Sequence, residues 1–257
     1  MPELPEVETL CRQLNQKISG ETILATETYD EKLASVKNVR GRKVTAVARE
    51  GKRIVIALDN GTAIFIHLRM TGRLLWQKDS EKPKHSRWKM VFTAGNVFLV
   101  DPRRFATVEV IKKKDSDPTK DIFKDFDLKR FIKTHASRKT NVKTLIMDKN
   151  AVEGIGNIYA CEILHRTCIN PQCPAAQLAE SDWKRIFRQA KVILEKSIMK
   201  RGTSISDWRD LYGEKGENQH ELKAYGQEGK KCSKCGGTIF RIKQGGRSTF
   251  YCPECQK

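Results

Sequence analysis

The sequence predicts an α+β protein in which a leading helix is followed by a β-sandwich, a helical region and a small C-terminal β-hairpin. Apolar residues recur at spacings of three and four near the start, and residues 23–114 hold short β-branched segments separated by turn residues. Helical periodicity then returns. We expect domains over residues 1–114, 128–228 and 229–257, with a linker over 115–127.

The leading helix is expected to begin at Pro5 and to end at Ser19-Gly20. Proline is favoured in the first helical turn, and the acidic Glu6 and Glu8 suit its electropositive end. Considered alone, Pro2 and Glu3 are ordinary helix-start residues. The apolar stripe consists of Val7, Leu10, Cys11, Leu14 and Ile18.

Short strands separated by hairpin turns are typical of a sandwich or a barrel. Turns are expected at residues 59–61 and 94–96, where glycine and asparagine gather. The expected strands are 43–47, 53–58, 63–66, 88–92 and 106–111.

Beyond the charged stretch 112–118, which is typical of a linker, the pattern predicts helices. Ser181 is the expected N-cap of the last helix, and Gly202 the residue that ends it. The expected helices are 128–135, 142–147, 158–165 and 181–200.

Charge favours a polyanionic partner. Lys and Arg total 49 against 31 Asp and Glu, a formal net charge of +18, and such an excess attracts nucleic acid. Ribosomal and membrane-surface proteins share this property. No apolar run is long enough to cross a membrane, and the N-terminus does not resemble a signal peptide, so we expect a cytoplasmic, nucleoid-associated protein without a membrane partner.

Four cysteines form two Cys-x-x-Cys pairs near the C-terminus. Cys232 and Cys235 are separated by 16 residues from Cys252 and Cys255, a spacing typical of a zinc ribbon. Four thiolates complete a tetrahedron around Zn²⁺, so we expect one structural zinc ion. The other cysteines, Cys11, Cys161, Cys168 and Cys173, are interpreted as buried, with a Cys168/Cys173 redox pair as the alternative.

Seven segments along nearly the whole chain resemble the formamidopyrimidine-DNA glycosylase family, bacterial enzymes for oxidised purines. They are Met1-Pro2-Glu3-Leu4-Pro5-Glu6-Val7-Glu8-Thr9, Gly51-Lys52, His67-Leu68-Arg69-Met70-Thr71-Gly72, Asp101-Pro102-Arg103-Arg104-Phe105, Gly154-Ile155-Gly156-Asn157-Ile158-Tyr159, Glu221-Leu222-Lys223-Ala224-Tyr225-Gly226 and the ribbon. The resemblance implies a helix-two-turn-helix element around Gly154 to Asn157. It also implies a partner, double-stranded DNA with damaged bases or abasic sites, which we expect a monomer to bind.

The resemblance implies base excision followed by strand cleavage. After removal of Met1, the Pro2 amine would form a Schiff base with the sugar, and successive β- and δ-elimination would follow. Glu3 would protonate the deoxyribose ring oxygen, and Lys52 would contact the phosphate beside the lesion or assist base loss.

The resemblance also implies DNA-binding residues. Met70, Arg103 and Phe105 would fill the void left by the extruded nucleotide, although core packing is the simpler interpretation of the two apolar residues. The implied phosphate contacts are His67, Asn157, Tyr225, Arg241 and Arg247.

The sequence departs from the family pattern at Ser86-Arg87-Trp88, where acidic and His residues are usual, and at 121–127, which lacks the usual Gly-Pro-Glu-Pro turn. Leu4-Pro5 favours the oxidised-purine branch over the endonuclease VIII branch. Two alternatives remain open, a non-catalytic DNA-binding protein and a metal-dependent nuclease. The second lacks a compact carboxylate cluster in the sequence.

Overall fold

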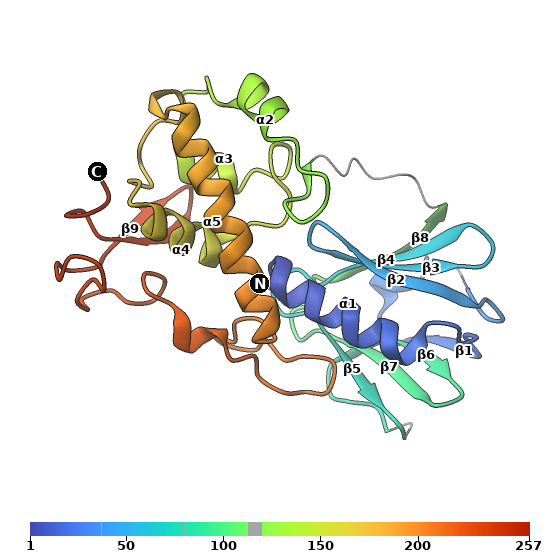
Figure 1. Cartoon of the computed structure of the whole chain (residues 1–257). Helices are drawn as coiled ribbons and strands as arrows, with labels where there is room; N and C mark the ends of the chain where they lie inside the picture. The colour runs from blue at the N-terminus through green and yellow to red at the C-terminus, as the bar shows by residue number, and fades with distance from the viewer. Residues whose placement is uncertain (37, 80, 113–119) are drawn as a thin grey trace. The chain divides into compact units, whose positions relative to one another are not determined.

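The computed structural model describes residues 1–36, 38–79, 81–112 and 120–257, which form two compact units (Figure 1). The first unit is Met1–Ser116 with Ile198–Gln219, and the second is Asp117–Ser197 with His220–Lys257. The linker was expected over residues 115–127, of which 115–119 lie outside the described residues. Its last part is packed into the second unit, because Asp121 bridges to Glu153 and Ile122 is fully buried.

The first unit is a β-sandwich of two antiparallel four-stranded sheets (Figure 1). One sheet has the order β1-β6-β7-β5, and the other has the order β2-β3-β4-β8. Their bounds are β1 Ala25–Thr28, β2 Val44–Glu50, β3 Arg53–Leu58, β4 Thr62–His67, β5 Arg73–Gln77, β6 Ser86–Phe92, β7 Gly95–Val100 and β8 Thr107–Lys112, with a 3₁₀ turn η1 at Glu31–Leu33.

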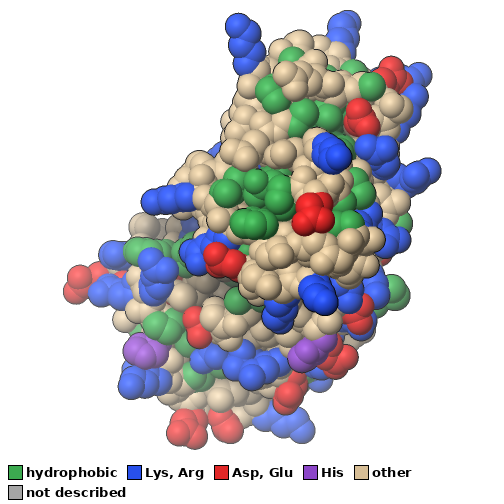
Figure 2. Space-filling model, turned by 90° about the vertical axis from the view of Figure 1, so that its left-hand side faces the viewer, with side chains coloured by type: hydrophobic (Ala, Val, Ile, Leu, Met, Phe, Trp, Pro, Cys, Tyr) green, Lys and Arg blue, Asp and Glu red, His purple; other side chains and the backbone are tan. Residues whose placement is uncertain are grey.

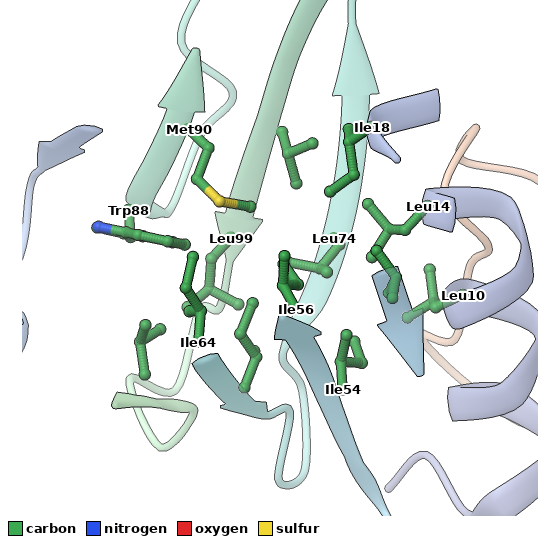
Figure 3. Packing of buried hydrophobic residues seen from close by; sticks show 14 of the residues in the cluster. Leu10, Leu14, Ile18, Ile54, Ile56, Ile64, Leu74, Trp88, Met90 and Leu99 are labelled. Carbon is green, nitrogen blue, oxygen red and sulfur yellow. The ribbon is translucent and has the colours of Figure 1, made fainter. Parts of the chain in front are cut away.

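Helix α1 (Leu4–Ile18) packs against β2 and β3 and closes one side of the sandwich core. Its stripe of Leu10, Leu14 and Ile18 is fully buried and points toward the inner faces of the sheets (Figure 3). Ile56, which pairs with Ile64 in register, continues this core. Each buried aliphatic side chain contributes about 1.5–3 kcal/mol, so the stripe fixes the helix on the sandwich.

A segment distant in sequence completes the first unit. The backbone amide of Trp76 donates to the carbonyl of Leu211 (2.8 Å), and the amide of Leu211 donates to the side chain of Gln13 (3.0 Å). Residues 198–219 therefore pack with the sandwich, although the sequence analysis assigned them to the helical domain.

The second unit contains the helices and the C-terminal hairpin. Helix α4 packs against α3 and strand β10, and Phe131 lies edge-on to Trp183 with ring centroids 5.1 Å apart. The bounds are α2 Leu128–His135, α3 Val142–Ile146, α4 Asn157–Thr167, η3 Ala175–Gln177, α5 Glu180–Met199, η4 Asn218–Glu221, β9 Phe240–Gln244 and β10 Arg247–Tyr251. None of the helices in the described parts of the chain is long and apolar enough to cross a membrane.

Three local predictions were wrong. Ser181 is not an N-cap, because α5 already begins at Glu180. The second hairpin does not turn at 94–96, since Gly95 pairs with Phe92 and Asn96 with Val91. Cys168 is exposed and Cys173 is half-buried, although both were expected to be buried. Strands β1, β5 and β7 were not predicted. The α+β class, the leading helix, the sandwich and the helical region are confirmed.

Candidate functional site

The start of α1 is buried and held by a carboxylate. Pro2 is buried, and Glu3, the N-cap of α1, is 2% exposed. The backbone amide of Glu3 donates to Oε2 of Glu6 (2.8 Å), whose Oε1 accepts from the amide of Thr203 (2.7 Å). Glu6 therefore ties the N-terminal residues to the returning segment of the same unit.

Close approach of the chain explains the glycine beside Thr203. Gly202 has a φ of +81°, and a Cβ atom there would lie 2.8 Å from Oε1 of Glu6. A larger residue would both strain the backbone and displace the carboxylate. Glu6 was not predicted as a site residue, because its partner Thr203 is 197 positions away in the sequence.

Lys52 lies in the turn that joins β2 to β3, the strand pair against which α1 packs. Gly51 has a φ of +56° in this turn. Arg49, which is 5% exposed, donates to the carbonyl of Gly51 (2.9 Å) and to Oε2 of Glu8 on α1 (3.0 Å). This chain of contacts links the turn that carries Lys52 to the helix that carries Glu3.

Two exposed hydrophobic side chains lie on turns of the sandwich. Met70 is 47% exposed and Phe105 is 48% exposed, so neither is a core residue. The guanidinium of Arg103, also exposed, lies 4.8 Å from the centroid of the Phe105 ring. Exposed apolar side chains beside a cation are unusual for packing and suit contact with bases.

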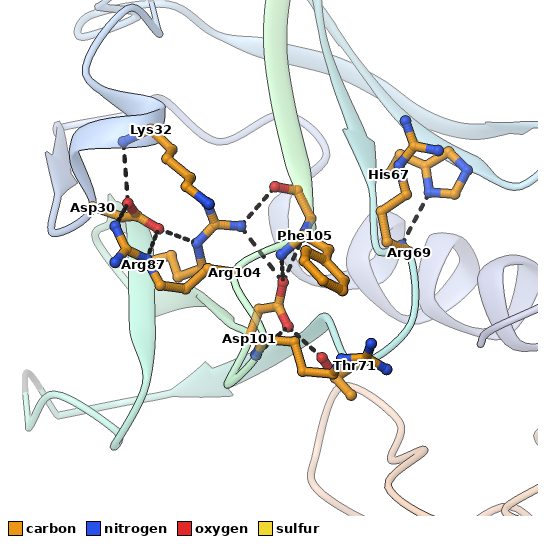
Figure 4. A network of polar contacts seen from close by, with 11 residues as sticks. Asp30, Lys32, His67, Arg69, Thr71, Arg87, Asp101, Arg104 and Phe105 are labelled. Atoms are coloured by element: carbon orange, nitrogen blue, oxygen red, sulfur yellow. Dashed lines mark hydrogen bonds and ion pairs between the residues drawn. The ribbon is translucent and has the colours of Figure 1, made fainter.

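His67 ends β4 just before the turn that carries Met70. Its Nδ1 accepts the backbone amide of Arg69 at 3.0 Å (Figure 4). Because Nδ1 accepts, the neutral ring carries its proton on Nε2, which is then a donor suited to a phosphate oxygen.

A buried polar cluster lies beside these turns (Figure 4). Asp30 pairs with Arg87 (2.5 Å) and with Arg104, and Arg87 lies 3.5 Å from Asp101. The hydrogen bond from Arg104, opposed by burial and reinforced by Arg87, holds the pKa of Asp30 well below its usual range. Burial acts to raise the pKa of Asp101, but hydrogen bonds from the amide of Ala106 and from neighbouring groups lower it.

In the second unit, Asn157 is the first residue of α4 and is held by two contacts. Its Oδ1 accepts from Nζ of Lys143 (2.5 Å), and its Nδ2 donates to the carbonyl of Ser248 (2.9 Å). Lys143, which is 2% exposed, also donates to Thr249 (2.7 Å). Lys143 was not predicted as a site residue, because its local signal in the sequence is a single charge within the apolar segment 142–146.

Lys143 also lines a cavity of about 380 Å³ together with Arg138 and Arg247. Asp148, which pairs with Arg138 (3.3 Å), lines the cavity too, so the lining holds three cations and one carboxylate. This excess of positive charge favours an anion such as a phosphate. Lys and Arg side chains are likewise spread over the face drawn in Figure 2, in keeping with the net charge of +18.

Tyr225 and Arg241 lie around Phe250 on the hairpin. The Tyr225 ring is edge-on to Phe250 at 5.0 Å, and the Arg241 guanidinium lies 5.9 Å from the same ring. The amide of Tyr225 donates to Glu162 (2.8 Å), a buried carboxylate that the sequence analysis also missed.

The ligand atoms of Cys232, Cys235, Cys252 and Cys255 all lie within 4.8 Å of one another. Four thiolates at such distances fit a tetrahedral zinc ion. His165, 3% exposed, contacts Sγ of Cys232 at 3.2 Å and braces the cluster. Among the described residues, no other group of three or more His, Cys, Asp or Glu side chains could hold a metal ion.

These features define the class: a basic protein with a β-sandwich, a helical region and a four-cysteine cluster of the zinc-finger type. Three family models match the chain. They describe the formamidopyrimidine-DNA glycosylase N-terminal domain (residues 1–108), the H2TH domain of the same enzyme (116–208) and the zinc finger found in FPG and IleRS (229–257).

Relatives and solved structures agree over the full length. The formamidopyrimidine-DNA glycosylases of Carboxydothermus hydrogenoformans and Desulfitobacterium hafniense are 39% and 36% identical, and each comparison covers 100% of both chains. A Lactococcus lactis FPG mutant in complex with Fapy-dG-containing DNA is 32% identical, with a TM-score of 0.91 over 100% of both chains. The chain belongs to the formamidopyrimidine-DNA glycosylase family. It is therefore a base-excision DNA-repair glycosylase with a helix-two-turn-helix domain and a zinc finger, as the sequence analysis predicted.

Proposed function

We propose that the chain excises oxidised purines, namely 8-oxoguanine and formamidopyrimidines, and then cuts the strand through a Schiff base on Pro2. The observation that carries the proposal is the burial of Pro2 and Glu3, where Glu6 holds the amide of Glu3 beside the strand pair that carries Lys52. Solved complexes of the Lactococcus lactis relatives with Fapy-dG DNA and with abasic-site DNA support the substrate class.

The first step is displacement of the base. Once Met1 is removed, the nitrogen of Pro2 is a secondary amine, and free α-amino groups with a pKa of about 8 are partly neutral at pH 7. The amine attacks C1′, and the glycosidic bond breaks with its electron pair leaving on the base, which takes up a proton. Glu3 then gives a proton to O4′, so the sugar ring opens and C1′ becomes an iminium.

The second step is elimination. The iminium acidifies the C2′ proton, and its removal breaks the C3′–O bond, which releases the 3′ phosphate (β-elimination). A second elimination releases the 5′ phosphate (δ-elimination), and water hydrolyses the remaining Schiff base. Lys52 contacts the phosphate beside the lesion or assists base loss.

The remaining site residues bind DNA. Met70, Arg103 and Phe105 fill the void left by the extruded nucleotide, and Arg103 pairs with the widowed cytosine. The DNA phosphates are contacted by five other side chains, those of His67, Asn157, Tyr225, Arg241 and Arg247. One zinc ion with four thiolate ligands leaves no open position, so its role is structural. The protein acts as a monomer.

Borohydride trapping tests the chemistry directly. A covalent complex is expected with a duplex carrying 8-oxoguanine opposite cytosine and with an abasic-site duplex. The adduct should disappear when Pro2 is replaced by Gly or when the N-terminus is acetylated. Glu3→Gln should abolish base excision, whereas the exposed Glu81→Gln serves as the matched control.

Each outcome has a distinct meaning. Trapping on the abasic site alone would retain the lyase step and refute the oxidised-purine specificity. No adduct on either duplex, with Met1 shown by mass spectrometry to be absent, would refute the Pro2 nucleophile. Tight DNA binding in that case would favour the non-catalytic alternative.

A further inference from the structure

Both turns that carry Met70, Arg103 and Phe105 contain a non-glycine residue in the left-handed region. Arg69, which precedes Met70, has a φ of 56°, and Arg104, between Arg103 and Phe105, has a φ of 58°. This conformation costs conformational free energy for residues with a Cβ atom, and it persists only where the surrounding structure enforces it.

Asp101 supplies that enforcement for the second turn. Its carboxylate is 1% exposed and accepts three backbone amides, from Arg103 (3.2 Å), Phe105 (2.7 Å) and Ala106 (2.7 Å) (Figure 4). Hydrogen bonds to an ionised acceptor are roughly twice as strong as neutral ones. One buried side chain therefore fixes the backbone on both sides of Arg104.

The same carboxylate holds the first turn. The hydroxyl of Thr71, the residue after Met70, donates to Oδ1 of Asp101 at 2.5 Å. The turn is closed by the amide of Gly72, which donates to the carbonyl of Leu68 (3.0 Å). A Cβ atom on Gly72 would lie 3.0 Å from that of Ala106, so the two turns are in direct contact.

Arg87 supports Asp101 from the protein interior. Its side chain is 3% exposed, donates to the carbonyl of Ala106 (2.6 Å) and lies between Asp30 and Asp101. With Arg104, the cluster alternates two carboxylates and two guanidinium groups, so its formal charge is balanced. Arg87 also lies in the segment Ser86-Arg87-Trp88, where the sequence departs from the formamidopyrimidine-DNA glycosylase pattern.

We propose that Asp101 and Thr71 are positioning residues that lock Met70, Arg103 and Phe105 into one preformed wedge. The inference rests on the proposed void-filling role of those three side chains. A wedge that is already rigid loses less conformational entropy on entering DNA, so the extruded state of the nucleotide is easier to reach.

Thr71→Val is the sharpest test, because it removes one hydroxyl and keeps the side-chain shape. We expect the single-turnover rate of 8-oxoguanine excision from duplex DNA to fall about tenfold, the effect of losing a hydrogen bond to a charged group. Cleavage of a single-stranded oligonucleotide with an abasic site, which has no opposite base to replace, should not change. Thr71→Ser should restore the duplex rate, and Thr93→Val, on an exposed turn, is the matched control.

A double-mutant cycle with Met70→Ala separates positioning from general stability. If Thr71 acts through Met70, Thr71→Val should add little in the Met70→Ala background. A fully additive effect, or equal losses on duplex and single-stranded substrates, would overturn the proposal. A 2-aminopurine next to the lesion provides a readout independent of chemistry, and its unstacking phase should slow in Thr71→Val.

The two proposals fail in different ways. Wild-type excision rates in Met70→Ala and Phe105→Ala would refute the void-filling role itself. A defect in those two variants, with a wild-type rate in Thr71→Val, would refute only the positioning role.

Discussion

Replacing Asp30 by Asn should strongly destabilise the first unit. The side chains of Asp30 and Arg87 are each 3% exposed and lie 2.5 Å apart. Asparagine keeps the shape of the side chain but removes its charge. Arg87 would then lose its ion pair with Asp30 and keep the one with Asp101, which lies 3.5 Å away.

The expected magnitude follows from burial. Removing one partner of a buried ion pair typically costs about 3–5 kcal/mol, because the other charge stays desolvated. Arg104 is 53% exposed in its side chain and can be solvated once Asp30 is neutral. We therefore expect a loss at the lower end, about 3 kcal/mol in the free energy of unfolding.

The pH dependence has a defined sign. The hydrogen bond from Arg104 and the pair with Arg87 hold the pKa of Asp30 below its unfolded value, which is about 3.9. Its contribution to stability is complete above that unfolded value and is lost as the pH falls through the lower folded one. The difference between wild type and variant should be constant from pH 7 to about pH 5 and shrink below about pH 4.

Urea unfolding followed by tryptophan fluorescence measures this difference. Trp76, Trp88 and Trp208 belong to the first unit, so a Trp183→Phe background isolates its transition. Asp207→Asn, an exposed change of the same type in the same unit, should leave stability nearly unchanged. A difference below about 1 kcal/mol at pH 7, or one that persists undiminished at pH 3, would refute the reasoning.

Two further predictions concern the DNA interface. Cys252→Ala removes a fully buried ligand of the cysteine cluster, so zinc content, thermal stability and DNA affinity should fall together; unchanged affinity in a folded variant would remove the ribbon from the interface. If the protein contacts about six DNA phosphates, a plot of log affinity against log salt concentration should have a slope of about −5. Arg247→Gln should make that slope less steep by about 0.9. A nearly flat slope in a fluorescence-anisotropy titration would contradict the electrostatic part of the model.

The elements that the sequence predicted are those whose pattern is local. Helix α1 has a stripe with helical spacing, and the spacing of the cysteines defines the ribbon. Strand β7 was missed because all six of its residues are buried and it lacks the alternation of a half-exposed strand. Ser181 was misassigned because a serine after an acidic residue suits both the N-cap and the first helical turn.

The same contrast applies to the site. Exposed site residues such as Met70 and Phe105 were predicted from the sequence, because they lie in motifs that resemble those of a known family. The residues that hold them were not predicted. Asp30 and Arg87 are 57 positions apart, and Glu6 and Thr203 are 197 apart, so no local pattern connects the partners.

The same arrangement recurs at three backbone sites that carry proposed site residues. In each, a buried carboxylate accepts two or three backbone amides, and a proposed site residue lies at or beside those amides. The three are Glu6 for Glu3 and Thr203, Asp101 for Arg103, Phe105 and Ala106, and Glu162 for Lys223, Ala224 and Tyr225. An amide side chain of equal shape would direct an NH₂ group at one or more N–H donors, so only a side chain that accepts on both oxygens satisfies these amides. Buried negative charge in a chain with a net charge of +18 is therefore explained by backbone geometry, since these carboxylates fix the backbone segments that carry the proposed site residues.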